Sequence, residues 1–344
     1  MRDIETLVNR VDAAFLKNVA QRFSNASSQQ LKQVNQAVTY MDLQTINGEE
    51  NTKQRFHQLA ISKYDDIALE RIIGKNHLMD ISFFSRGLEV AKTVCRLIVF
   101  EGQNKLPVGT GFLVGGGLLM TNNHVIRSKP FANRLVAEFE YEKDHTGLLK
   151  TSYFFTLNPD AFFITNKKLD YTVVAVDPIS SNDPDKKLST YGCNKLALSS
   201  NRILQGEAVS IIQHPKGLPK MIAIRENRVV EIKESFIHYT TDTQQGSSGS
   251  LVANDKWEII ALHSSGVPET DEKGNIKLTK KGFYTGPADE PFINWVANQG
   301  VLMDAILRDI AAKKVKAHQI EKKKILLEKY QVEVSEEEYR LPSR

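Results

Sequence analysis

The chain has 344 residues, of which 41% are hydrophobic and 25% charged, and its formal net charge is +4. This length suits two domains or one large domain with appendages, and the composition is globular, which argues against long disordered segments. The charge is too small to indicate a nucleic-acid partner, which ordinarily appears as a concentrated basic stripe.

The N-terminal residues and the two cysteines both indicate the cellular compartment of the protein. Met1 to Glu5 show no basic segment followed by an apolar run, and no apolar stretch approaches the roughly 20 residues that span a bilayer. Cys95 and Cys193 belong to no Cys-x-x-Cys pair, which favours two reduced structural thiols over a disulfide. We therefore expect a cytoplasmic protein that does not bind a membrane.

Residues 1–82 are predicted to be helical, because apolar side chains recur there at steps of three and four. A second helix would begin after Ser27 or Ser28 and end at Asn47–Gly48, and a third would end at Gly74. The sequence predicts a small all-α domain of three or four helices, without a catalytic cluster. The first apolar stripe consists of Ile4, Leu7, Val8, Val11, Phe15 and Val19.

Residues 83–300 have a different hydrophobic pattern, in which short apolar segments are separated by Gly, Asn, Asp and Pro. This spacing is typical of an all-β barrel or sandwich. A helical pattern returns at Glu290, and residues 301–344 are predicted to form a charged helical extension in which acidic residues offset the lysines. The expected β segments are 94–100, 111–120, 135–141, 171–176, 208–212, 229–232, 250–253 and 259–263.

Ser248 lies in a glycine-rich segment, Gly246–Ser250, between two β-prone runs. Glycines allow a tight loop that exposes a hydroxyl and directs backbone N–H groups to one point. The N–H groups of Gly246 and Ser248 are candidates for an oxyanion hole. Taken alone, such a cluster more often marks an ordinary loop.

Two further residues complete a possible catalytic set. His124 follows a predicted strand pair, and an imidazole can accept and return a proton near neutral pH. Asp170 precedes an apolar strand, where an aspartate either caps a turn or orients an imidazole. Each has a structural explanation by itself, but the order His, Asp, Ser at strand edges predicts a catalytic triad.

These three motifs resemble the signatures of the trypsin-like serine peptidases over about residues 90–300. The resemblance implies a mainly β fold of two six-stranded antiparallel β-barrels, preceded by a small all-α domain and followed by a C-terminal helix. It implies a serine endopeptidase in which Ser248 attacks the substrate, His124 transfers the proton and Asp170 orients the imidazole, with no cofactor and no metal. The motifs are Thr121–His124, Leu169–Tyr171 and Gly246–Ser250.

The residues around Ser248 resemble most closely the bacterial glutamyl endopeptidases. Those enzymes contact the substrate glutamate through a threonine five positions before the serine and a histidine fifteen positions after it, which correspond here to Thr243 and His263. Ser264 and Gly266 fit the strand that pairs with substrate. Asp242 lies where trypsin carries the aspartate that selects basic residues, so acidic and basic P1 residues both stay open, and we favour acidic.

Regulation is expected to come from residues 1–82. The sequence contains no internal Ile-Val-Gly-Gly segment of the kind that zymogen cleavage exposes. A helical region ahead of a protease resembles the adaptor-plus-effector layout of bacterial conflict systems, which favours limited proteolysis in anti-phage defence and a protein partner or self-association through this region. Two alternatives stay open, a pseudoprotease that only binds partners and a clustering scaffold.

Overall fold

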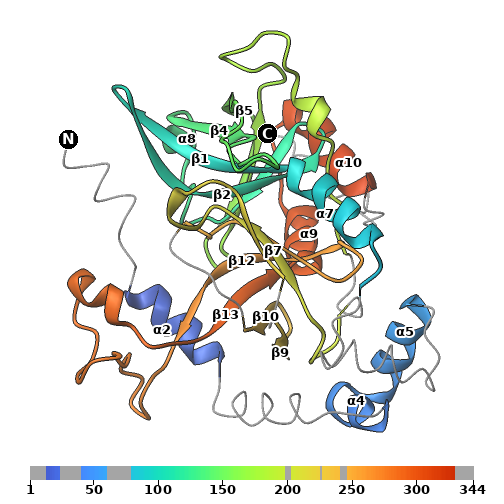
Figure 1. Ribbon diagram of the computed structural model, residues 1–344, viewed down its shortest axis with the longest axis vertical. Helices are drawn as coiled ribbons and strands as arrows, with labels where there is room; N and C mark the ends of the chain where they lie inside the picture. The colour runs from blue at the N-terminus through green and yellow to red at the C-terminus, as the bar shows by residue number, and fades with distance from the viewer. Residues whose placement is uncertain are drawn as a thin grey trace, which may run out of the picture.

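Two antiparallel β-sheets form the centre of the molecule, and short helices lie around them (Figure 1). The computed structural model describes residues 13–23, 40–59, 79–197, 203–224, 227–240 and 246–329. The mainly β fold predicted from the sequence is confirmed. None of the helices in these residues is long and apolar enough to cross a membrane.

The first sheet is a closed six-stranded barrel with strand order β1-β2-β3-β6-β5-β4. Its interior holds apolar side chains that alternate along the strands, such as Leu97, Leu113 and Leu119, which are at most 3% exposed. Cys95 is buried and bonded to a backbone carbonyl, whereas Cys193 is exposed. The strands are β1 (Val94–Glu101), β2 (Asn104–Gly115), β3 (Leu118–Thr121), β4 (Leu135–Phe139), β5 (Tyr153–Asn166) and β6 (Tyr171–Val176).

The second sheet has seven strands in the order β8-β7-β11-β12-β13-β10-β9, one more than the six expected from the sequence. The sheet curls so that the segment before β7 meets the start of β9: Val209 N donates to Asn227 O at 2.8 Å, and Val229 N donates to Glu207 O at 3.0 Å. The extra strand β8 pairs with residues 211–213 of β7, beyond this junction. The strands are β7 (Ser210–Gln213), β8 (Met221–Ala223), β9 (Val229–Ile232), β10 (Phe236–Tyr239), β11 (Leu251–Ala253), β12 (Ile259–Pro268) and β13 (Trp295–Leu302).

β13 corrects the prediction that helical structure resumes at Glu290. Its apolar residues suit helical spacing, but the strand lies between β12 and β10 and pairs with both. Residues 297–302 are all buried because neighbours cover both edges and both faces. Such a strand carries no alternation that would distinguish it from a buried helix. The helix begins only at Met303.

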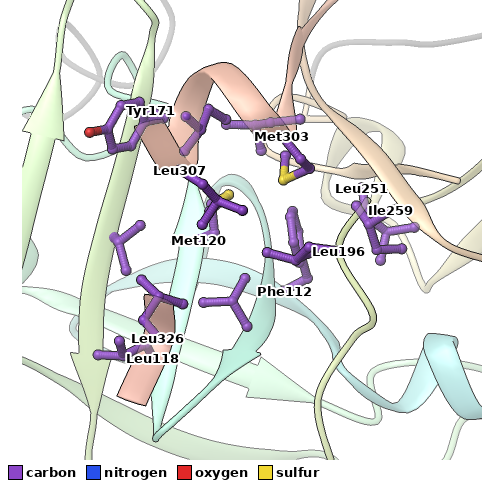
Figure 2. Packing of buried hydrophobic residues seen from close by; sticks show 14 of the residues in the cluster. Phe112, Leu118, Met120, Tyr171, Leu196, Leu251, Ile259, Met303, Leu307 and Leu326 are labelled. Atoms are coloured by element: carbon purple, nitrogen blue, oxygen red, sulfur yellow. The ribbon is translucent and has the colours of Figure 1, made fainter. Parts of the chain in front are cut away.

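A shared hydrophobic core joins the two sheets to the C-terminal helices (Figure 2). Phe112 and Met120 come from the barrel, Leu251 and Ile259 from the second sheet, and Met303 from α9. The predicted C-terminal helix is two helices, α9 (Met303–Ala312) and α10 (Ile320–Lys329). The remaining helices on the β domain are α7 (Ser82–Lys92), α8 (Lys129–Ala132) and the short 3-10 turns η1 (Leu188–Tyr191), η3 (Pro215–Gly217), η4 (Pro287–Phe292) and η5 (Ala317–Gln319).

Within residues 13–23 and 40–59, the N-terminal helices do not pack together as the compact bundle expected from their apolar stripes. Helix α2 (Ala13–Arg22) contacts β12, whereas α4 (Tyr40–Asn47) and α5 (Glu49–Leu59) form a hairpin well apart from it (Figure 1). The break predicted at Asn47–Gly48 is confirmed, with Gly48 at φ +82°. The caps predicted near Ser27 and the helix end at Gly74 lie outside the described residues, and the domain boundary at residue 82 stays a prediction.

Helix α5 is attached to the second sheet by a buried ion pair. The Arg55 side chain is 0% exposed and donates from Nε and Nη2 to the two carboxylate oxygens of Glu207, both at 2.8 Å. Nearby, Gln205 N donates to Asn47 Oδ1 at 2.7 Å. The α4–α5 hairpin is therefore held by oriented polar contacts.

Candidate active site

His124 lies in the turn that follows β3. Asn122, which is fully buried, donates from Nδ2 to the Asp170 carbonyl at 2.9 Å, and Ile126 N donates to Asn122 O at 3.0 Å. The first bond connects the turn to Asp170, the residue before β6, and the second closes the turn itself. Because β3 and β6 are paired neighbours in the barrel, the histidine and the aspartate come together at one end of the sheet.

Both carboxylate oxygens of Asp170 contact the His124 ring. Nδ1 of His124 lies 2.9 Å from Oδ2 and 3.0 Å from Oδ1, and the backbone N–H of His124 donates to Oδ1 at 3.0 Å. The Asp170 side chain is 5% exposed and the His124 side chain 31%. A carboxylate only accepts hydrogen bonds, so Nδ1 carries the proton and Nε2 is left as the basic nitrogen.

Ser248 is presented by a loop of the second sheet that is bonded to the barrel through Thr110. Thr110 N donates to Ser248 O at 2.9 Å, and its hydroxyl donates to Gly246 O at 2.8 Å while accepting from His214 N at 3.2 Å. The loop conformation requires glycine at position 249, where φ is +87° and a Cβ would lie 2.0 Å from Thr110 O.

Ser264 connects the aspartate to the serine. Its hydroxyl donates to Asp170 Oδ2 at 2.7 Å, and its carbonyl accepts from Ser248 Oγ at 3.4 Å. His124, Asp170 and Ser248, predicted as a set from the sequence, are thus gathered around one residue of β12. A hydroxyl, an oriented imidazole and a buried carboxylate brought together in this way are the groups that acyl transfer requires.

His263 is buried beside this group. Its Nδ1 lies 2.7 Å from the Tyr239 hydroxyl. Burial lowers the pKa of His263 to about 3, so the ring is neutral near pH 7. Burial also keeps the pKa of Tyr239 well above its ordinary value, so its hydroxyl keeps the proton and is able to donate to Nδ1. In the tautomer that accepts this bond, Nε2 of His263 carries the proton.

The structure describes only some of the other residues predicted to contact substrate. Asp242 and Thr243 lie outside the described residues. Gly266 lies in β12, and a Cβ at this position would be 2.6 Å from the Trp295 ring, so the indole packs directly on its backbone. Gly246, predicted for the oxyanion hole, has φ +93°, and a Cβ there would lie 2.8 Å from His214 O. The glycine therefore allows close approach of the loop that contains His214.

Sequence reasoning missed two contacts. Thr110 was not singled out, although the neighbouring Gly109 is a signal in the sequence, because a glycine inside a strand often marks the close approach of another backbone. In the structure a Cβ at Gly109 would lie 3.2 Å from Ser248 O. Phe15 was assigned only to a helical stripe, yet its ring centroid lies 5.5 Å from that of His124. No local pattern indicates this second contact, because it joins residues more than one hundred positions apart.

A pocket of about 260 Å³ opens beside His124 on the barrel side, lined also by Arg127, Ser128, Pro130, Phe131 and Arg134. It shows that the imidazole is reachable from this direction. Within the described residues, no cluster of three or more His, Cys, Asp and Glu side chains is arranged to hold a metal ion.

Comparisons with known proteins agree with this geometry. Residues 109–262 match the sequence profile of the trypsin-like peptidase domain. The chain is 37% identical over 260 residues to Uncharacterized protein y4fB of Sinorhizobium fredii (strain NBRC 101917 / NGR234), covering 70% of this chain and 39% of that protein. It is 28% identical over 224 residues to Secreted RxLR effector protein 73 of Plasmopara viticola, covering 57% of this chain and 51% of the effector.

The chain thus spans about half or less of the length of these curated relatives. Among solved structures, it is similar to the active form of the Rv3671c protease from M. tuberculosis, with a TM-score of 0.43 and 12% identity. That match covers 68% of this chain and 86% of the protease.

Proposed function

The chain contains a trypsin-like peptidase domain, and on that premise we propose that it is a serine endopeptidase that uses Ser248, His124 and Asp170. One observation supports the proposal. Ser264 bonds to both Asp170, which pairs with His124 on the barrel, and Ser248 on the second sheet, so hydrogen bonds link the three groups.

The proposed reaction follows from the geometry. In the substrate complex the Ser248 hydroxyl turns from the Ser264 carbonyl to His124 Nε2, which takes the proton as Oγ attacks the scissile carbonyl. Asp170 stabilises the imidazolium, and the N–H groups of Gly246 and Ser248 donate to the oxyanion. The imidazolium then protonates the leaving amine, and water, activated by the same histidine, releases the acyl group from Ser248.

We also propose a preference for an acidic P1 side chain. The preference rests on the tautomer of neutral His263 in which Nδ1 accepts from Tyr239: Nε2 then has an N–H, which is the group that a P1 carboxylate needs. Thr243 would add a hydroxyl. The competing preference, for basic P1 residues, rests on Asp242. A peptide panel that differs only at P1 tests this directly: faster cleavage after Arg than after Glu would reject the acidic preference.

The proposed biology is regulated limited proteolysis of a protein substrate, with the N-terminal helices as the regulatory element and a protein partner or self-association acting through them. A cytoplasmic role in bacterial anti-phage defence is part of the same proposal. It is supported by the order of helical and protease regions in the sequence.

The test of the peptidase compares wild-type protein with Ser248→Ala on a diverse peptide library. The variant should lose nearly all cleavage, since only oxyanion stabilisation and binding remain. Ser189→Ala, at an exposed serine of the barrel, is the matched control and should cleave like wild type. Equal cleavage by wild type and Ser248→Ala would reject Ser248 as the nucleophile, whereas absence of cleavage by wild type would favour the pseudoprotease or scaffold alternatives.

A further inference from the structure

The edge of β12 beside the triad is the surface on which a substrate chain must lie. β11 pairs with β12 only over residues 259–262, and β13 pairs with it from Ala261 to Pro268. Among the described strands, residues 264–268 therefore have a neighbour on one side and an unpaired edge on the other. An extended peptide that pairs with this edge runs past Ser264, whose carbonyl contacts Ser248.

Helix α2 packs on this part of β12 (Figure 1). Val19 is 0% exposed and packs on Val267 and Ala297, and Leu16 is 1% exposed and packs on Ile276 and Ile293. A ten-residue helix is marginal by itself in water, so its stability here comes from the buried face.

Both ends of α2 make specific contacts. At the start, the ring of Phe15 lies 5.5 Å from that of His124, centroid to centroid, at an interplanar angle of 47°. At the end, the guanidinium of Arg22 lies 3.9 Å from the ring centroid of Phe236, and the Arg22 carbonyl accepts a hydrogen bond from Lys233 Nζ. A lysine at a helix C-terminus also complements the helix dipole.

From these contacts we infer that α2 is a built-in inhibitor that lies across the β12–β13 face next to the substrate edge and against the ring of His124, and that the peptidase becomes fully active only when α2 leaves. The inference rests on the proposed peptidase function. A helix satisfies its own backbone groups and cannot pair as a strand, so α2 at this position obstructs a substrate without presenting a peptide bond for attack. The pocket at Arg127 and Arg134 lies outside this block, in agreement with the partial exposure of His124.

The experiment places an aspartate on the buried face of α2. The matched control places an aspartate one position earlier, on the exposed face. Val19→Asp should release the helix, and Asn18→Asp, at an exposed position, should not. We expect kcat/KM on a peptide substrate to rise about tenfold or more for Val19→Asp and to stay within about twofold for Asn18→Asp. Leu16→Asp is a second releasing variant.

Hydrogen exchange of α2, measured in the Ser248→Ala background, reports release without any need for activity. Fast exchange in Val19→Asp or Leu16→Asp together with wild-type kcat/KM would overturn the inhibitory role while leaving the peptidase intact. Slow exchange in both variants would overturn the claim that the buried Leu16 and Val19 side chains hold α2 in place. Absence of cleavage by every variant despite fast exchange would instead reject the peptidase proposal, and this inference with it.

Discussion

The buried ion pair between Arg55 and Glu207 leads to a quantitative prediction for Glu207→Gln. The substitution keeps the shape of the side chain but removes the charge that compensates a guanidinium with 0% exposure. Breaking one partner of a buried pair costs about 3–5 kcal/mol, because the other charge is left uncompensated. Glu207 Oε1 also accepts from Leu204 N at 3.1 Å, a bond that the glutamine oxygen can keep, so the expected loss comes from the missing charge.

The assay is urea unfolding with the free energy extrapolated to water, combined with limited proteolysis of the α4–α5 hairpin. A loss of about 3 kcal/mol or more, or cleavage near α5 at native conditions, is the expected result. Glu49→Gln on the same helix is the matched control, since Glu49 and Lys53 form an exposed pair and their separation should not change stability measurably. If Glu207→Gln unfolds within about 1 kcal/mol of wild type and resists proteolysis, Arg55 does not anchor the hairpin.

Two further predictions concern the site. Thr110→Val removes the hydroxyl that bonds Gly246 O and His214 N, so kcat should fall by about 10- to 100-fold with a smaller change in KM; steady-state kinetics showing kcat within about twofold of wild type would contradict this. Burial lowers the pKa of both His214 and His263 to about 3, so below pH 6.5 the unfolded chain binds protons that the native one does not. The free energy of unfolding should therefore fall between pH 6.5 and 3, by about 1.4 kcal/mol per pH unit for each histidine, and His263→Gln should remove half of this contribution in urea titrations from pH 7 to pH 5.

The sequence was most informative where local chemistry decides structure. Short apolar runs bounded by Gly, Asn and Asp located most strands, and the glycines around Ser248 correctly indicated a tight loop. The prediction was wrong at residues 295–302, because a strand buried on all sides has no period of two. Ser264 was assigned to substrate contact, and its bond to Asp170 depends on how β12 meets the barrel, which no local pattern records.

The same holds for the contact between Phe15 and His124, which depends on where a helix docks after the sheets have formed. An amphipathic stripe states that one face of the helix will be buried, but not against which surface. Sequence reasoning therefore found the candidate chemical groups and missed the residues that hold or cover them.

Because α2 belongs to the same chain as the cleft it covers, its binding is intramolecular and governed by an effective concentration rather than by a bulk one. For segments joined by short linkers this is on the order of millimolar, so a helix whose separate affinity is only about 10 µM would still occupy the cleft in all but a few per cent of molecules. Such weak intrinsic affinity also makes release easy. A partner that binds α2 tightly can remove it reversibly, and no covalent cut in the chain is required to expose the triad.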